Sequence, residues 1–348
     1  MNSKELTLSA IRNIPEKIPF NPFIMHLAAI LNNIDYCKEY VRKPEVLTKC
    51  QIKCANFFGI DHVNVSTDAY REANAWGVEI DFSSHTPMPK KGSELDWREF
   101  ESIDAPNLME CDRIIERVKA VEILYNEIGS SQCIIGWIEA PFAAIISIFG
   151  MMNVFKINNK KWNEIIKSLI KRVVPVQLEF AKLQIEAGAD IIGAGDSAVS
   201  QIGPWRYKEA CLEYTQKLFK EIEKKVPVLY HTCGDNSRVD KEGNDMLKLL
   251  ASSGASILDI DYQVDLGVAK TKIGNKICIR GNTNTSLLGK IDYSPEKIVK
   301  LISNTIELGK PGGRYMYAAG CEWVWEPRDI AIRNLSIAKS ICEKIGYY

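Results

Sequence analysis

Eight short segments rich in β-forming residues alternate with longer amphipathic segments along this chain. Such alternation is typical of parallel β-strands connected by α-helices. The segments expected to be strands are residues 19–25, 62–66, 133–137, 190–194, 226–230, 256–260, 276–280 and 314–318. The helical patterns cover residues 43–58, 105–128, 162–187, 204–224, 244–253, 294–308 and 328–345. Eight βα units are the number in a (β/α)8 TIM barrel, so we predict this α/β fold as a single domain over residues 1–348.

Two parts of the chain fall outside the repeating βα pattern. Residues 1–18 are expected to form an N-terminal helical extension. Residues 76–91, between the second and third predicted strands, have alternating apolar side chains at Val78, Ile80 and Phe82. Alternation with period two is typical of a strand, so we predict a hairpin-like insertion there.

The charge and the apolar content of the chain narrow the kinds of molecule that the protein could bind. Lys plus Arg and Asp plus Glu both number 44, so the net charge is zero and no basic field is available to attract nucleic acid. The N-terminal residues lack the apolar core of a signal peptide, and no apolar run approaches the length of a membrane span. We therefore expect a cytoplasmic protein that acts on a small molecule, without nucleic acid or membrane partners. A homo-oligomer is compatible with the sequence.

A His-x-Cys motif follows the fifth predicted strand. His231 and Cys233 should point to the same side of an extended chain, because side chains alternate with period two. Cys321 follows the last predicted strand and could supply a second thiolate. Two cysteines and one histidine, with a fourth position left open, are typical of a catalytic zinc site. The motif thus predicts a metal centre of His231, Cys233 and Cys321.

Other residues that could bind ligands or transfer protons also follow predicted strands. Barrel enzymes place their chemistry at the carboxyl ends of the strands, which favours a functional role for such residues. They are Asp68, Glu139, Asp196, Asp259, Asp261, Asn282 and Glu322. Their distribution strengthens the zinc hypothesis. The remaining cysteines lie in helical or strand patterns and are interpreted as small buried apolar residues.

These motifs together resemble the uroporphyrinogen decarboxylase superfamily, and more closely its zinc- and corrinoid-dependent methyltransferase branch. The resemblance covers about residues 18–339, and its most specific positions, His231, Cys233 and Cys321, match the zinc ligands of that branch. Decarboxylases of the superfamily carry an arginine-rich N-terminal substrate motif. Residues 19–26 contain no arginine here, which argues against a porphyrinogen substrate, whose carboxylates need cationic partners.

The resemblance implies transfer of a methyl group from a small O-methylated donor, with a methoxy-aromatic compound favoured, to the cob(I)alamin of a corrinoid-binding protein. A separate corrinoid protein is expected because no Asp-x-His-x-x-Gly motif occurs in the chain. Coenzyme M methyltransferases of this branch typically have a glycine where Glu139 stands, and residues 196–204 look like a motif of bacterial enzymes that demethylate small donors. The alternatives are a methylcobalamin:thiol methyltransferase and a metal-free uroporphyrinogen decarboxylase-like enzyme.

Within this hypothesis, Glu139 and Asp196 are the candidate catalytic acids, which would orient the substrate or protonate the departing oxygen. The candidate substrate-binding residues are Asp68, Asp261, Tyr262, Asn282 and Trp323, with Trp325 as a further aromatic contact. Structural roles stay open for several of them. Asp196 could cap a helix, Asp259 or Asp261 could pair with Arg280, and Asn282 could form a turn.

Overall fold

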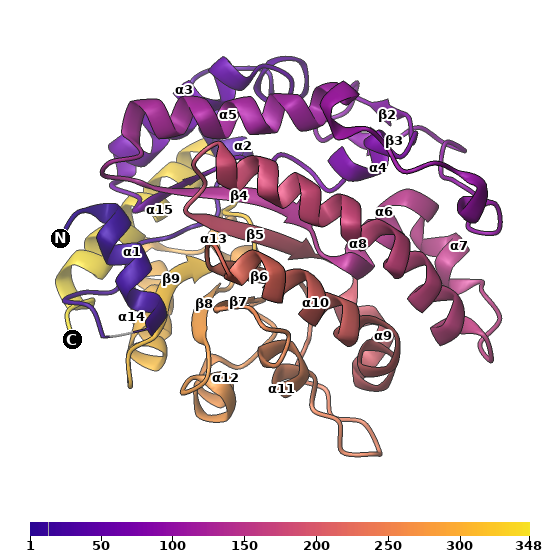
Figure 1. Ribbon diagram of the computed structural model, residues 1–348. Coiled ribbons are helices and arrows are strands. Elements are labelled where there is room, and N and C mark those ends of the chain that lie inside the picture. The colour runs from indigo at the N-terminus through magenta and orange to yellow at the C-terminus, as the bar shows by residue number, and fades with distance from the viewer. Residues whose placement is uncertain (13) are drawn as a thin grey trace.

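A curved parallel sheet with helices around its outer surface forms the centre of the molecule (Figure 1). The structure is a computed structural model that describes residues 1–12 and 14–348. Within these residues, seven strands are hydrogen-bonded in the order β1-β4-β5-β6-β7-β8-β9. They are β1 (His62–Asn64), β4 (Cys133–Glu139), β5 (Ile191–Asp196), β6 (Val228–Thr232), β7 (Ile257–Ile260), β8 (Cys278–Thr283) and β9 (Tyr315–Ala319). The predicted TIM-barrel-like α/β fold is confirmed.

The first predicted strand, residues 19–25, is not a regular strand. Phe20 forms a single parallel bridge with Tyr317 of β9, and the Phe20 carbonyl accepts a hydrogen bond from the N–H of Asp61, just before β1. This segment therefore lies between the two edge strands of the sheet and joins them through few hydrogen bonds. Pro22 has no N–H to contribute to a ladder, which gives a physical reason for the missing strand.

Every predicted helical range contains a helix, although the ends differ, and six further short α-helices lie outside those ranges, at residues 26–31, 71–75, 141–149, 151–155, 266–273 and 285–288. The longer ones are α3 (Pro44–Phe58), α5 (Asp112–Ile128), α8 (Trp162–Glu186), α10 (Leu212–Glu223), α14 (Pro295–Gly309) and α15 (Arg328–Ile345). Shorter ones are α2 (His26–Leu31), α4 (Arg71–Ala75), α6 (Pro141–Phe149), α7 (Met151–Phe155), α9 (Val199–Arg206), α11 (Met246–Ala251), α12 (Leu266–Ile273) and α13 (Thr285–Leu288). None of the helices described is both long and apolar enough to cross a membrane.

Both predicted additions to the barrel are present. Helix α1 (Ser3–Arg12) lies in the N-terminal extension, of which residue 13 is outside the described residues. The insertion contains the antiparallel pair β2 (Ile80–Asp81) and β3 (Met88–Pro89), which lies beside α4 in Figure 1. We call residues 76–91 the insertion hairpin below.

Strand register decides which side chains face the barrel interior. Glu139, Gly195, His231, Asp259 and Arg280 are successive partners across β4 to β8. Residues that are partners on adjacent parallel strands point to the same side of a sheet. The polar side chains of this row therefore share the interior, and the next residue along each strand faces the outer helices.

Candidate metal centre

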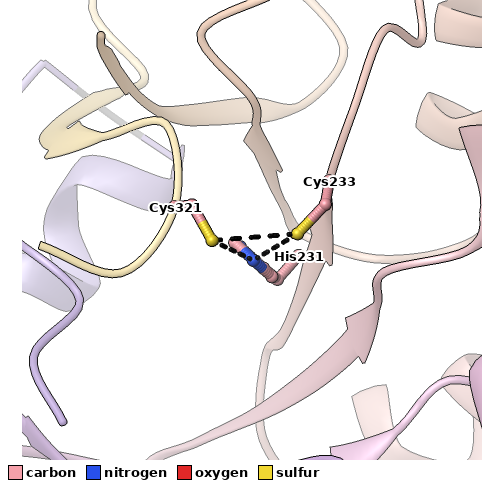
Figure 2. A group of neighbouring side chains, drawn as sticks. All are labelled: His231, Cys233 and Cys321. Atoms are coloured by element: carbon pink, nitrogen blue, oxygen red, sulfur yellow. Dashed lines mark hydrogen bonds between the residues drawn. The ribbon is translucent and has the colours of Figure 1, made fainter. Parts of the chain in front are cut away.

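The side chains of His231, Cys233 and Cys321 meet at the carboxyl ends of β6 and β9 (Figure 2). Cys233 Sγ lies 3.2 Å from His231 Nε2 and 3.9 Å from Cys321 Sγ. Cys321 Sγ lies 3.8 Å from His231 Nε2. His231 is buried and both cysteines are partly exposed, so the group is reached from the end of the barrel. The structure thus brings together the three residues that the sequence singled out.

The spacing of these three atoms suits a tetrahedral zinc ion. Zinc at about 2.3 Å from sulfur and about 2.0 Å from nitrogen separates two sulfur ligands by about 3.8 Å and sulfur from nitrogen by about 3.5 Å. The observed separations of 3.9, 3.8 and 3.2 Å lie close to those values. The donor types and their distances therefore fit zinc, with a fourth position left for a substrate atom.

A buried carboxylate orients the imidazole of His231. Asp259 Oδ2 lies 2.7 Å from His231 Nδ1 and also forms an ion pair with Arg280. The Arg280 guanidinium donates further hydrogen bonds to the Asn21 carbonyl, at 2.9 and 2.7 Å. An Nδ1–H bond to a carboxylate leaves the Nε2 lone pair free to bind a metal, as in carboxylate–histidine–zinc triads. The sequence left open whether Asp259 has a functional role or pairs with Arg280, and in the structure it contacts both His231 and Arg280.

The two thiols of the group differ in acidity. The hydrogen bond from Cys233 and the contact with His231 lower the pKa of Cys321 well below its ordinary value, although burial opposes this. The same hydrogen bond, followed by burial, raises the pKa of Cys233. For His231, burial acts to lower the pKa, but Asp259 and Cys321 outweigh it and raise the pKa to about 10. Cys321 is therefore the more acidic of the two thiols.

Asp261, just after β7, and Asn282, near the end of β8, hold the loops around the metal centre. Asp261 accepts hydrogen bonds from the N–H of Gly234, at 3.0 Å, and of Gln263, at 2.9 Å. The side-chain amide of Asn282 donates to the carbonyls of Asp261, at 3.1 Å, and Val264, at 2.7 Å. Both predicted substrate-binding residues are buried and make these bonds within the protein. They stabilise the loops around the metal centre.

Tyr262 lies against the other ligand loop. A Cβ atom at Gly320 would overlap the Tyr262 backbone, so only glycine allows the chain next to Cys321 to approach this closely. The Tyr262 side chain is partly exposed. Among the predicted substrate-binding residues, Tyr262 therefore lies beside the metal centre and keeps accessible surface.

Two aromatic rings pack beside His231. Phe23 and Trp137 stack with centroids 4.7 Å apart, and their centroids lie 5.6 and 6.1 Å from that of the His231 ring. Cβ atoms at Gly193 would overlap the indole, so this glycine makes room for Trp137 inside the barrel. Sequence reasoning missed this pair. The signal available was a glycine in β5 directly beside a tryptophan in β4.

Glu139, at the end of β4, faces the barrel interior. Its Oε1 accepts a hydrogen bond from Arg71 at 2.9 Å, and its Oε2 lies beside Gly195. Burial raises the pKa of Glu139 well above its ordinary value, and Glu72 adds to this effect, whereas Arg71 opposes it. A raised pKa favours the protonated carboxyl group, which is the form that a general acid requires.

Asp196, at the end of β5, points in the opposite direction. Its Oδ1 accepts hydrogen bonds from the N–H groups of Ala198 and Val199, at 3.3 and 3.0 Å, where α9 begins. Its Oδ2 accepts one from the Tyr230 hydroxyl at 3.1 Å. Asp196 pairs in register with Thr232, one residue beyond the His231 row, so its side chain lies on the outer face. These contacts correspond to the helix-capping alternative.

Asp68 and Trp323 are also engaged within the protein. Asp68 forms an ion pair with Arg113 and accepts hydrogen bonds from Thr67 and from the N–H of Tyr70. The arginine contacts outweigh burial and lower the pKa of Asp68 to about 2. Trp323 is fully buried, which leaves no ring surface for a substrate.

Trp325 and His26 form a second aromatic group next to the Cys321 loop. The His26 ring stacks between Tyr36, at 3.6 Å, and Trp325, at 4.3 Å between centroids. Trp325 is partly exposed. A cavity of about 580 Å³ borders it, lined by Ile30, Trp325, Glu326, Pro327 and Arg328.

This protein is an α/β barrel whose candidate metal-binding residues, His231, Cys233 and Cys321, lie at the carboxyl ends of its strands. The chain belongs to the uroporphyrinogen decarboxylase (URO-D) family, whose sequence profile matches residues 2–333. It is 23% identical over 281 residues to a uroporphyrinogen decarboxylase of Geobacter sp. (strain M21), covering 79% of this chain and 78% of that protein. It is also 23% identical to the uroporphyrinogen decarboxylase of Nostoc punctiforme, covering 69% and 72%.

Two solved structures share the fold. A methyltransferase from Methanosarcina mazei superimposes with a TM-score of 0.84 at 18% identity and covers 99% of both chains. A B12-independent methionine synthase from Shewanella superimposes with a TM-score of 0.58 at 11% identity, covering 94% of this chain and 97% of that chain. At these identities the likeness concerns the fold.

Proposed function

We propose that this protein is a zinc-dependent methyltransferase. It would move a methyl group from a small O-methylated donor, with a methoxy-aromatic ether favoured, to the cob(I)alamin of a separate corrinoid-binding protein. The single observation that carries this proposal is the convergence of His231, Cys233 and Cys321 with atom separations that fit tetrahedral zinc. Family membership and the fold shared with a protein named as a methyltransferase support it.

The chain's own residues would prepare the ligand set. Asp259 holds the Nδ1 side of His231, so that Nε2 faces the two thiols, and Arg280 fixes Asp259 in turn. A bound zinc ion would act as a Lewis acid on the ether oxygen, where negative charge develops as the carbon–oxygen bond breaks. Burial of His231 and Asp259 keeps water away from the inner side of the group.

Of the two candidate acids, Glu139 fits the proton-transfer role better. Its side chain shares the barrel interior with His231, and its pKa is raised by burial. Asp196 faces the outer helices and already accepts three hydrogen bonds. In this proposal, protonated Glu139 supplies the proton to the departing oxygen, and Asp196 stabilises the start of α9.

Tyr262 is the aromatic residue near the metal centre that keeps accessible surface for a methoxy-aromatic donor, and it adjoins the Cys321 loop. Phe23 and Trp137 are buried and pack beside His231, so they form an apolar wall behind its ring. Stacking on an aromatic ring contributes about 0.5–1.5 kcal/mol beyond the area buried. Asp261 and Asn282 would support this region by holding the ligand loops, rather than by touching the donor.

The metal content of the purified protein tests the first part of the proposal. We expect about one zinc per chain in the wild type and none in His231→Ala. His85→Ala is the matched control, because its side chain is exposed and lies outside the group. Wild-type protein that takes up no zinc under conditions free of chelator would overturn the metal mechanism and favour the decarboxylase-like alternative.

A methyl-transfer screen tests the direction. Methoxylated aromatic compounds would be incubated with cob(I)alamin, and formation of the methyl–cobalt bond followed by absorbance. We expect demethylation of at least one ether. Methylation of thiols by methylcobalamin, with no ether consumed, would instead favour the thiol methyltransferase alternative, since the same three ligands can bind a thiolate. Consumption of uroporphyrinogen by metal-free protein would favour a decarboxylase.

A further inference from the structure

Each of the three residues of the candidate metal centre has a largely buried carboxylate nearby. Asp259 contacts His231, and Asp261 binds the N–H of Gly234, which follows Cys233. For Cys321 the corresponding residue is Glu322, its neighbour in the chain. The Glu322 carboxylate turns away from the thiol and contacts His26 at the start of α2.

The contact between Glu322 and His26 has two parts. Glu322 Oε1 accepts a hydrogen bond from the backbone N–H of His26 at 2.7 Å and lies 3.0 Å from His26 Nδ1. Both side chains are at least nine-tenths buried. The His26 ring is held on both faces by Tyr36 and Trp325, so it has little freedom to turn. A carboxylate bonded to two donors on a fixed element is itself fixed.

Few other bonds hold the loop that carries Cys321. The N–H of Gly320 donates to the Thr283 carbonyl at 2.9 Å, and the N–H of Trp323 donates to the Phe23 carbonyl at 2.7 Å. These bonds lie on either side of Cys321 and Glu322. The Glu322 side chain therefore supplies the anchor between them, one residue from the thiol.

His26 also connects this anchor to the insertion hairpin. Its Nε2 lies 3.1 Å from the Thr86 hydroxyl and 3.3 Å from the His85 carbonyl. The hairpin packs further through Phe82, whose ring lies 5.0 Å from the Arg42 guanidinium and 5.4 Å from that of Arg113. The hairpin is an addition to the barrel, and through His26 it reaches the loop of a metal ligand.

We propose that Glu322 and His26 are a positioning pair for Cys321, completed by Thr86 of the insertion hairpin. The inference rests on the proposed function, because it assigns the pair to the metal centre. Glu322 fixes the Cys321 loop at the spacing that zinc requires, and the hairpin stabilises His26 in the orientation that Glu322 needs. Outer residues of this kind typically change metal affinity by about 10–100-fold when replaced.

Zinc affinity is the first measurement, made by competition with a chromophoric chelator. We expect Glu322→Ala to bind zinc about tenfold or more weakly than the wild type. Glu322→Gln keeps the oxygen that accepts both bonds and should stay within about threefold, as a conservative rescue. Glu326→Gln is the matched control, because Glu326 lies in the same loop and is exposed. Thr86→Val should weaken binding less than Glu322→Ala, because it removes only the outer partner of His26.

Hydrogen exchange of the metal-free protein is the second measurement and does not depend on zinc. The amides of His26 and Trp323 report directly on the anchor, and we expect at least about tenfold faster exchange in Glu322→Ala, a loss of about 1.4 kcal/mol of local stability. Unchanged exchange would overturn the pair. Faster exchange with unchanged zinc affinity would also overturn it, by reducing it to a structural contact. If the wild type binds no zinc, the proposed function fails, and exchange alone decides whether the pair holds the loop.

Discussion

Asp259 in β7 and Asp196 in β5 lie near the carboxyl ends of their strands, and their sequence contexts look alike. Each is an acid at the end of an apolar strand segment. Asp259 is in register with His231 and contacts its ring inside the barrel, whereas Asp196 is in register with Thr232 and caps α9 on the outside. A difference of one position in register separates a residue that supports the metal centre from one that supports a helix.

Among the residues inside the barrel, the loss of a candidate zinc ligand should have the largest effect on zinc binding and methyl transfer. We predict that Cys321→Ser removes both zinc and methyl transfer while the barrel stays folded, because serine is a much poorer ligand and the side chain is only partly buried. Elemental analysis and circular dichroism would measure the two results. Cys111→Ser is the control, since Cys111 lies outside the group. Full activity without metal would contradict the prediction.

Replacement of Asp259 should have the next largest effect. In Asp259→Ala the buried Arg280 loses its carboxylate, and we expect a loss of about 3–5 kcal/mol in the free energy of unfolding. Asp259→Asn keeps the size of the side chain, so it serves where the alanine variant does not fold. We expect this variant to bind zinc about 10–100-fold more weakly, measured by chelator competition. Wild-type zinc affinity in Asp259→Asn would contradict the orienting role.

Glu139→Gln separates proton transfer from metal binding. If Glu139 protonates the departing oxygen, methyl transfer should fall by about 10²–10⁴-fold, with the zinc content unchanged. Asp196→Asn provides the comparison, because its outward side chain should leave the rate near that of the wild type. A larger rate loss in Asp196→Asn than in Glu139→Gln would reverse the assignment of the two acids.

On the outer side of the sheet, Asp196 should make the stability of the protein depend on pH. Burial raises the pKa of Asp196 from 3.8 to about 7, although its hydrogen bonds oppose this. Because the folded pKa exceeds the unfolded one, this contribution to stability is fully present below about pH 4 and is lost as the pH rises to about 7. Asp196→Asn cannot titrate, so it should lack this loss, which amounts to at most about 1.4 kcal/mol per pH unit. Denaturant unfolding of both proteins at several pH values between 4 and 7 measures it.

Asp68 should respond to pH in the opposite direction. Its pKa is lowered to about 2, so its contribution is present above the unfolded value and disappears as the pH falls toward 2. In the same titration, Asp68→Asn should therefore be less stable than the wild type at pH 7 and approach it in acid. An equal response of Asp68→Asn and Asp196→Asn would contradict the difference between the two sites.

The sequence by itself determined the βα order, the insertion hairpin, the N-terminal helix and the three residues of the candidate metal centre. The elements follow from hydrophobic periodicity, and the period-two geometry puts His231 and Cys233 on one side of a strand. Cys321 was identified by its place after the last predicted strand, since barrel enzymes place their chemistry at strand ends. Where a local pattern was ambiguous, the prediction was wrong, as at residues 19–25, where Pro22 interrupts a strand-like run.

The tertiary structure decided what the other strand-end residues do. Register placed Glu139 and Asp259 inside and Asp196 outside, and packing buried Trp323 completely. The contacts of Glu322 with His26 and of Phe23 with Trp137 join segments far apart in the chain. Local patterns contain no information on such pairings, because they depend on how strands align and how loops fold back across the end of the barrel.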